Sequence, residues 1–331
     1  MGLTPSFRYR RPFASGCARA ERDRLRTMKR ARALSIIVML HLGMGLTLSA
    51  SLQQSPQESV SLSSHLVLLN LTVTDARSAY VGGLRQEDFS IFEDGVPQTI
   101  AFFGSEETPF AAAILIDVSG SMQQMIRIAC AAARNFAQKM RGDDVFAVYV
   151  FADRVARVQD FGTYPELDEI VWHIQPEGYT ALYDGVYQAV QDLRQRPERR
   201  RAILVLSDGA DTRSRHSLTE AMKVAAEASV TIYTVNLMDP RYARRAEALQ
   251  AMGALRAMAE KTGGRYIADP GGTRMYEAFD EIVEELRHQY TIGYYPTPEK
   301  TDGKWHKISV KVSRPGVRVR TRPGYRAPKR R

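Results

Sequence analysis

Residues 114–122 read Ile-Leu-Ile-Asp-Val-Ser-Gly-Ser-Met, and this stretch decides the fold. The apolar run Phe110 to Ile116 stops abruptly at an aspartate, and a helical pattern begins a few residues later. Such a run is typical of a buried strand in a parallel sheet, where ligands bind beyond the carboxyl ends of the strands. Asp117, Ser119 and Ser121 are therefore candidate ligands, because their oxygen atoms suit a hard cation such as Mg²⁺.

Ser119 and Ser121 also allow a simpler interpretation, as N-cap residues of the helix that follows. Two later stretches bear on the choice. In Gly178-Tyr179-Thr180-Ala181-Leu182-Tyr183-Asp184-Gly185 a threonine opens a predicted helix. In Leu204-Val205-Leu206-Ser207-Asp208-Gly209 a second apolar strand ends at an aspartate. Asp117, Thr180 and Asp208 are therefore expected at one rim of the sheet.

The order Asp-x-Ser-x-Ser, then Thr180, then Asp208 resembles the metal-ion-dependent adhesion site (MIDAS) of von Willebrand factor A (VWA) domains. The resemblance covers roughly residues 107–290 and implies a Rossmann-like α/β fold. It implies that the Ser119 and Ser121 hydroxyls are direct metal ligands. Thr180 would be a third ligand, either direct or through water. Asp117 and Asp208 would bind the metal with their carboxylates, again either directly or through water. The implied cofactor is a divalent cation. Mg²⁺ is the expected ion, and Mn²⁺ and Ca²⁺ are the alternatives.

A cation held by two carboxylates and neutral hydroxyls has room for an external carboxylate, since charge-assisted oxygen ligation is strong. We expect a protein partner that offers an Asp or Glu side chain. Asp184 and Asp211 are candidates for orienting the ligands, with ordinary helix-start and turn chemistry an equal alternative. Tyr179 stands where many members of the family have a small residue, so it is expected to shape the rim of the site.

Enzymatic activity has less support, and no catalytic residues are predicted. Residues 116–121 do not form a Gly-x-Ser-x-Gly nucleophile elbow, and no P-loop lysine motif occurs. The six histidines are scattered, so neither a zinc site nor a triad is indicated. The alternative to adhesion is a structural VWA module of an envelope assembly in which the metal only orders loops. A hydrolase is the least favoured class.

The net charge of +9 does not predict nucleic-acid binding, because of where the charge lies. Residues 1–32 hold ten Arg and Lys residues and two acidic ones, so the basic character belongs to the leader. A basic start at Met28, an apolar run from 33 to 48 and small residues at 49–51 predict a secretory signal peptide, with an uncleaved anchor as the alternative. The mature chain is expected to begin near residue 50, without a membrane span, and to be secreted, periplasmic or in the cell envelope. Cleavage would remove Cys17 and leave Cys130, a predicted core residue, as the single cysteine.

β-rich segments precede and follow the α/β part. Residues 51–106 contain a predicted strand at 66–74 and a hairpin through Asp94-Gly95 that returns at 98–103. The sequence Phe-Glu-Asp-Gly there resembles the segment before the A domain in secreted bacterial VWA-related proteins. Residues 291–331 contain two more predicted strands. Neither segment can close a core alone, so 291–331 is expected to pair with 60–105 in one small β-sandwich.

Between these segments, alternating strands and helices predict a mostly parallel sheet with helices on both faces. The segment 155–161 is expected to be an antiparallel edge strand, and 167–174 a short helix. The basic run from Arg194 to Arg201 is interrupted by Pro197 and is interpreted as a solvated loop.

Overall fold

The structure, a computed structural model, describes residues 65–105, 108–164, 167, 169, 173–238, 241, 244–268 and 274–329. The chain divides into a unit of residues 1–60 and a compact unit of residues 61–331. The predicted signal peptide, Cys17 and half of the helix predicted at 167–174 lie outside the described residues. Within the described ranges, no helix combines the length and the apolar character that crossing a bilayer requires.

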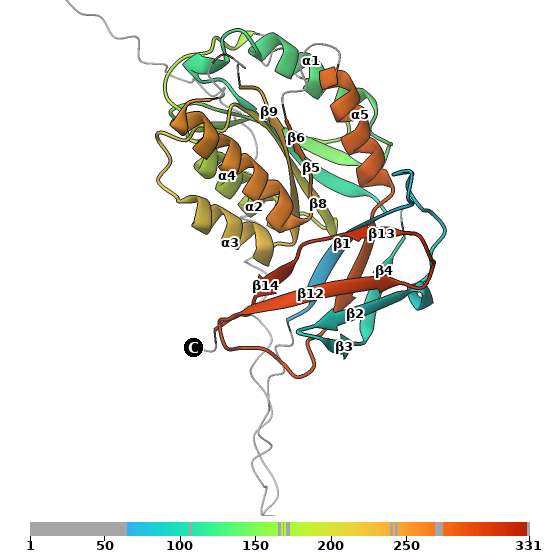
Figure 1. Cartoon of the computed structure of the whole chain (residues 1–331). Helices are drawn as coiled ribbons and strands as arrows, with labels where there is room; N and C mark the ends of the chain where they lie inside the picture. The colour runs from blue at the N-terminus through green and yellow to red at the C-terminus, as the bar shows by residue number, and fades with distance from the viewer. Residues whose placement is uncertain are drawn as a thin grey trace, which may run out of the picture. The chain divides into compact units, whose positions relative to one another are not determined.

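The central layer is a six-stranded sheet in the order β10-β9-β8-β5-β6-β7 (Figure 1). Its strands are β5 (Phe110–Asp117), β6 (Val145–Phe151), β7 (Val155–Gly162), β8 (Arg200–Ser207), β9 (Val230–Asn236) and β10 (Tyr266–Ile267). All neighbours are parallel except β6 and β7, so the antiparallel edge strand is confirmed. Every residue of β5 is buried, because the strand lies between β6 and β8 with helices on both faces.

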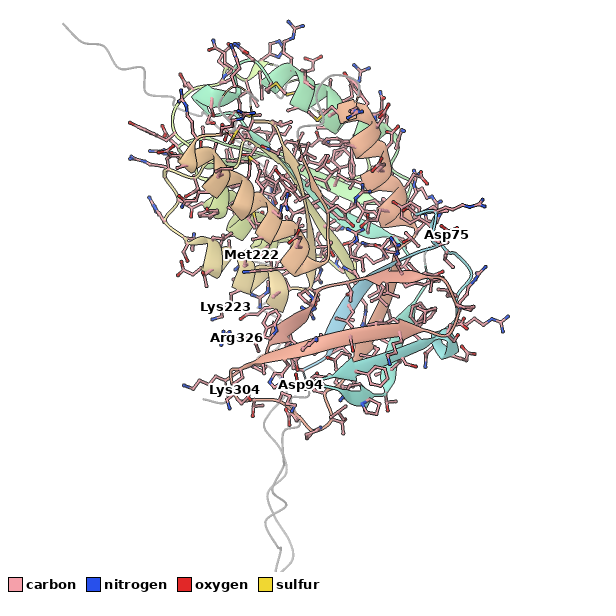
Figure 2. The ribbon with its side chains drawn as sticks, in the orientation of Figure 1. Asp75, Asp94, Met222, Lys223, Lys304 and Arg326 are labelled. Atoms are coloured by element: carbon pink, nitrogen blue, oxygen red, sulfur yellow. The ribbon has the colours of Figure 1, made fainter. Side chains whose placement is uncertain are left out.

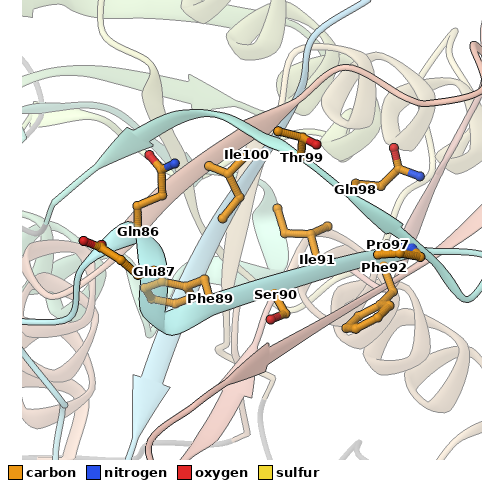
Figure 3. A pocket seen from close by; sticks show the side chains of 10 residues that line it. All are labelled: Gln86, Glu87, Phe89, Ser90, Ile91, Phe92, Pro97, Gln98, Thr99 and Ile100. Carbon is orange, nitrogen blue, oxygen red and sulfur yellow. The ribbon is translucent and has the colours of Figure 1, made fainter.

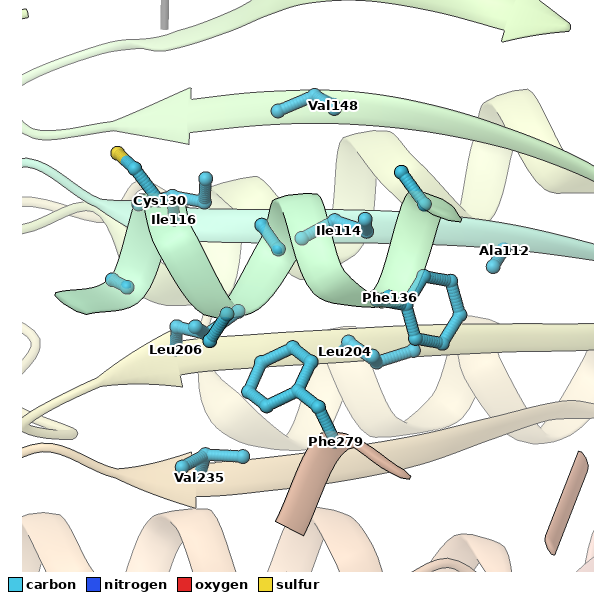
Figure 4. Close-up of a cluster of buried hydrophobic side chains, with 14 of the residues drawn as sticks. Ala112, Ile114, Ile116, Cys130, Phe136, Val148, Leu204, Leu206, Val235 and Phe279 are labelled. Carbon is cyan, nitrogen blue, oxygen red and sulfur yellow. The ribbon is translucent and has the colours of Figure 1, made fainter. Parts of the chain in front are cut away.

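Helices cover both faces of this sheet, which confirms the predicted α/β architecture. They are α1 (Ile126–Gln138), α2 (Leu182–Arg194), α3 (Leu218–Glu227), α4 (Ala246–Thr262) and α5 (Arg274–Arg287). One face carries α1 and α5, and Phe136 meets Phe279 edge to face over the sheet (Figure 4). The other face carries α2, α3 and α4. Cys130 is buried in α1, as its place in the apolar stripe predicted.

The β-rich segments form two four-stranded antiparallel sheets with a shared core. One has the order β13-β1-β11-β4 and the other β14-β12-β2-β3. The strands before the α/β body are β1 (Val67–Thr74), β2 (Phe89–Glu93), β3 (Val96–Gln98) and β4 (Ile100–Gly104). Those after it are β11 (Tyr290–Tyr294), β12 (Trp305–Val312), β13 (Arg318–Arg320) and β14 (Gly324–Arg326). Each sheet thus combines strands from both ends of the described chain.

The hairpin at Asp94-Gly95 departs from the prediction in its second half. Both turn residues have positive φ, 49° and 84°, which suits the tight two-residue turn between β2 and β3. The returning segment then splits at Thr99. Residues 96–98 pair with β2, whereas β4 leaves for the other sheet and pairs with β11. The single strand expected at 98–103 is therefore two strands in different sheets.

The basic run also departs from the prediction. Arg200 and Arg201 belong to β8, and Arg200 is buried with its guanidinium over the Phe110 ring. Its guanidinium also donates a hydrogen bond to the Thr108 carbonyl. Pairing of β8 with β5 draws the start of the strand into the sheet, and the side chain stays in contact with protein acceptors there. The solvated-loop interpretation is wrong for these two residues.

A buried carboxylate joins α5 to both β layers. Glu285 accepts hydrogen bonds from the hydroxyls of Tyr233 in β9, at 2.7 Å, and Thr72 in β1, at 3.2 Å. Its other oxygen pairs with Arg320 of β13 and lies 3.8 Å from Arg265. The α/β body and the sandwich are therefore joined by a polar cluster in addition to the chain connections.

Candidate metal centre

Asp117 is the last residue of β5, and its carboxylate is inaccessible to solvent. One oxygen accepts the backbone N–H of Ser119 at 2.9 Å, and the other accepts the Ser207 hydroxyl at 2.5 Å. Burial, with a further contribution from the negative charge of Asp208, raises the pKa of Asp117 to about 6, even though the hydrogen bonds from Ser119 and Ser207 act in the opposite direction. A carboxylate in such surroundings gains from a nearby cation.

The hydroxyls of Ser119 and Ser121 lie 3.1 Å apart. Residues Gly120–Met122 form a short 3₁₀ turn with Ser119 at its N-cap position, yet no side chain caps that turn. Helix α1 begins only at Ile126, after Met125, and also lacks a side-chain cap. The N-cap interpretation of the two serines is therefore wrong, and their hydroxyl oxygens meet each other beside Asp117 instead of helix N–H groups.

Thr180 is buried at the entrance to α2, and its backbone is hydrogen-bonded to the loop after β8. Its carbonyl accepts the N–H groups of Thr212 and Arg213, each at 2.9 Å, and its own N–H donates to the Thr212 hydroxyl at 3.0 Å. Two residues earlier, the Gly178 carbonyl accepts the N–H of Gly120 at 3.2 Å. The loops after β5, before α2 and after β8 therefore lie together at the carboxyl edge of the sheet.

Asp208 is half-buried directly after β8, and one of its oxygens accepts the N–H of Ala210 at 3.1 Å. Its charge acts on Asp117, so the two carboxylates that end neighbouring strands lie close enough to repel each other. Two carboxylates and a pair of hydroxyls that cap no helix form an oxygen donor set, which fits a hard divalent cation.

Asp184 and Asp211, the candidates for orienting the ligands, both organise the loop after β8. Asp184 accepts the N–H groups of Arg215 and His216 and contacts the His216 ring at 2.7 Å. Burial opposes these hydrogen bonds, yet they hold the pKa of Asp184 below its usual value. Asp211 accepts the Ser214 hydroxyl at 2.6 Å and the Tyr183 N–H at 3.2 Å, and burial raises its pKa. These hydrogen bonds fix the loop that contains Thr212.

Tyr179 lies at the rim and exposes 61% of its surface. Its N–H donates to an Asp153 carboxylate oxygen at 2.9 Å. Gly178, with φ of +80°, brings the backbone so close to Asp153 that a Cβ atom would lie 2.9 Å from the carboxylate. Asp153 thus fixes the loop that presents Tyr179.

Three supporting residues were missed by the sequence analysis. Ser207 donates to Asp117, Thr212 binds the backbone of Thr180, and Asp153 binds that of Tyr179. Ser207 had a sequence signal, since it ends the apolar strand immediately before Asp208. Thr212 and Asp153 belong to loops whose composition alone does not indicate a contact with the segment at 178–180.

Two further features lie in the sandwich. Ligand atoms of Glu93, Asp94 and His306 lie within 4.8 Å of one another, near the turn that contains Asp94 (Figure 2). The His306 ring already pairs with Asp94 at 2.7 Å and Asp302 at 3.0 Å, as a protonated imidazole would. A groove of 680 Å³ has Phe89, Ile91 and Ile100 among its lining residues (Figure 3). Neither feature includes any of the five predicted metal ligands.

Comparison with known proteins identifies the family of the α/β body. Residues 89–263 match the family described as "VWA domain containing CoxE-like protein". No curated protein matches the chain.

Solved structures similar to the chain are remote in sequence. A von Willebrand factor type A protein from Catenulispora acidiphila has a TM-score of 0.46 and 14% identity, over 81% of this chain and 75% of that one. An aerotolerance-related membrane protein from Bacteroides fragilis has a TM-score of 0.42 and 18% identity, over 54% and 98%. The pilus adhesin SpaC from Lactobacillus rhamnosus GG has a TM-score of 0.44 and 10% identity, over 77% and 49%.

Proposed function

Because the chain belongs to the family of VWA domain-containing, CoxE-like proteins, we propose that it is a metal-dependent protein-binding module. In this proposal a MIDAS holds a divalent cation, with Mg²⁺ as the expected ion. The ligands come from Asp117, Ser119, Ser121, Thr180 and Asp208. The partner is a protein that offers an Asp or Glu carboxylate.

The observation that carries the proposal is the arrangement around Asp117. Two hydroxyl oxygens, 3.1 Å apart and capping no helix, lie beside a buried carboxylate that is repelled by a second one. Such a site is electrostatically unfavourable without a cation, because burial and like charge both oppose ionisation of Asp117. It becomes favourable when a cation balances the two carboxylates.

Each group in the site has a separate task. The Ser207 hydroxyl and the Ser119 N–H hold the Asp117 carboxylate in one orientation. The carboxylate therefore loses little conformational entropy when the cation binds. The serine and threonine hydroxyls contribute oxygen without charge, so the cation keeps part of its charge for an external ligand. The cation would supply the electrostatic attraction for the carboxylate of the partner.

The structural alternative, in which the metal only orders loops, has less support. The Ser119–Ser121, Gly178–Thr180 and Thr212–Arg213 loops are already joined by backbone hydrogen bonds of 2.9–3.2 Å. Loops so connected do not need an ion to hold them together. The signal pattern at residues 28–51 supports export to the cell envelope or beyond. The non-enzymatic character that we infer rests instead on the sequence, which contains neither a nucleophile elbow nor a P-loop motif.

Calorimetry tests the metal site. Mg²⁺ and Mn²⁺ are titrated separately into the purified wild-type protein and into Asp117→Asn and Ser119→Ala. Asp117→Asn keeps the side-chain shape but removes a charge, so metal affinity should fall at least about tenfold. Equal metal uptake by wild type and both variants would refute the site, and circular dichroism verifies that each variant is folded.

A pull-down from cell-surface extract, with and without a chelator, tests the adhesive role. Capture of partners should be lost with the chelator and in the Asp117→Asn variant. If partner binding survives while the metal is lost, the adhesive function is wrong and the structural alternative is favoured.

A further inference from the structure

Tyr179 is a large aromatic side chain in solvent whose backbone is held rigidly. The ring is 61% exposed, yet the Tyr179 N–H is hydrogen-bonded to Asp153 and the preceding Gly178 carbonyl accepts the N–H of Gly120. A rigid aromatic side chain loses little conformational entropy on binding, which is why exposed Tyr residues are frequent at interfaces.

The guanidinium of Arg213 lies over this ring, 5.7 Å from its centroid. Arg213 is itself exposed, and in the described part of the chain no carboxylate pairs with it within 4.0 Å. A guanidinium that rests on an aromatic face keeps its N–H groups available at the edge of its plane. This geometry suits two parallel hydrogen bonds to a carboxylate.

Both residues are placed by Thr180, one of the predicted metal ligands. Tyr179 immediately precedes Thr180, and the Arg213 N–H donates to the Thr180 carbonyl at 2.9 Å. The aromatic ring and the guanidinium therefore belong to the rim of the metal site and not to a separate patch. Glu177 is an exposed carboxylate of the same loop, so the rim contains one opposing charge that a partner has to accommodate.

We propose that the Tyr179–Arg213 pair is a second binding position of the site, which accepts a second carboxylate of the same partner. The inference rests on the proposed function, because the first carboxylate is the one that the metal binds. It specifies the partner further, as an acidic segment with two nearby Asp or Glu side chains and not an isolated one. Arg213 supplies the hydrogen bonds, and Tyr179 holds its guanidinium in place.

Synthetic peptides test this inference without knowledge of the natural partner. Blocked peptides of equal length carry either a single aspartate or two aspartates separated by zero to four alanines. Their affinities for the purified protein are measured by NMR titration in saturating Mg²⁺. The best two-aspartate peptide should bind wild type about three- to tenfold tighter than the one-aspartate peptide. A purely statistical advantage would be about twofold.

Variants separate the rim pair from general electrostatics. In Arg213→Gln and Tyr179→Ala, the affinity of the two-aspartate peptide should fall to about twice that of the one-aspartate peptide. Tyr179→Phe should preserve the wild-type ratio of these affinities, because the aromatic face remains. Arg215→Gln is the matched control, since it removes the same charge from an exposed residue of the same loop. Asp117→Asn should weaken both peptides and lower the ratio of their affinities toward two, because the first carboxylate loses the metal that binds it.

Two results would overturn the inference while the proposed function stands. One is a wild-type ratio of two or less with metal-dependent binding of both peptides. The other is an equal fall of the affinity ratio in Arg215→Gln and Arg213→Gln, which would mean that only net charge matters. If neither peptide binds in a metal-dependent way, the proposed function fails and the inference fails with it.

Discussion

The Ser207 hydroxyl donates a 2.5 Å hydrogen bond to Asp117 across the neighbouring parallel strands β8 and β5. Both side chains are fully buried at the ends of their strands. The Ser207 oxygen also accepts the N–H of Gly209 at 2.9 Å, in the turn that begins with Asp208. A single hydroxyl therefore supports both of the predicted carboxylate ligands.

Ser207→Ala should lower the free energy of unfolding by about 1–3 kcal/mol, because a buried carboxylate loses a donor. Metal affinity should fall about tenfold, as for other residues that orient a ligand. Urea unfolding and calorimetry measure the two effects. Ser90→Ala, at an exposed position of β2, is the control and should leave both quantities unchanged. A Ser207→Ala protein as stable as the control would show that the bond is unimportant.

Asp208→Asn should have opposite effects in the absence and presence of metal. Without metal the variant should be at least as stable as wild type, because the repulsion of Asp117 is relieved. With Mg²⁺ at a hundred times its Kd, wild type should gain about 2.7 kcal/mol, and the variant should gain much less. Thermal unfolding with and without Mg²⁺ measures this, with Asp143→Asn at an exposed turn as the control. If Mg²⁺ raised the Tm of Asp208→Asn as much as that of Asp143→Asn, Asp208 would not be a metal ligand.

His306 should make stability depend on pH in a defined direction. Burial alone would lower its pKa, but the hydrogen bonds with Asp94 and Asp302 prevail and raise it. The contribution of His306 is therefore complete below its unfolded value of 6.5 and is lost as the pH rises through the raised folded pKa. The pKa values of Asp94 and Asp302 are lowered from 3.8, so their contribution is lost only on strong acidification.

The free energy of unfolding should accordingly decline from pH 6.5 upward in wild type and less steeply in His306→Gln. Chemical denaturation at intervals between pH 5 and pH 9 measures the slope. His173→Gln, which changes an exposed histidine, is the control and should retain the wild-type slope. Identical slopes in His306→Gln and wild type would mean that the ion pairs contribute nothing.

Glu285→Gln should destabilise the protein by roughly 2–4 kcal/mol, because Arg320 and Arg265 lose a buried carboxylate partner. Glu281→Gln is a matched control one turn earlier in α5. Glu281 also pairs with Arg265, at 2.6 Å, but it is more than half exposed, so its loss should cost less than about 1 kcal/mol. Equal losses in the two variants would argue against a special role of burial at Glu285.

Deletion of residues 291–331 should expose residues 65–104 to proteolysis. Strand β1 pairs with β11 and β13, and β2 pairs with β12, so the deletion removes partners from both sheets. Limited proteolysis with mass spectrometry would locate the cleavage sites. Protection of 65–104 after the deletion would show that the N-terminal strands hold together without the C-terminal ones, and the proposed domain organisation would be wrong.

The α/β fold could be predicted because its signals are local. The run from Phe110 to Ile116 is buried on both faces, and an uninterrupted apolar segment is the direct consequence. The same rule placed Asp117 and Asp208 at strand ends, and parallel pairing of β5 with β8 puts strand ends at one edge. Their role as metal ligands stays a prediction.

The remainder could not be predicted because it depends on tertiary pairing. Nothing in the local sequence indicates that the chain changes sheets at Thr99, since both halves have the same β-forming character. The burial of Arg200 depends on the register of β8 against β5, which a charged run does not reveal. The contact of Thr212 with Thr180 joins residues 32 positions apart through loops of ordinary composition.

The division of the sandwich between the two ends of the chain has a consequence for synthesis on the ribosome. Strands β1 to β4 emerge first, and both of their sheets stay incomplete until β11 to β14 emerge. The α/β body, between Phe110 and Arg287, contains every strand of its own sheet. The body can therefore begin folding earlier. Until β11 to β14 emerge, the N-terminal strands have unpaired backbone N–H and C=O groups at their edges, and such edges favour aggregation. A nascent chain stalled before Tyr290 would present all five proposed metal ligands while β1 and β4 still lacked every partner strand.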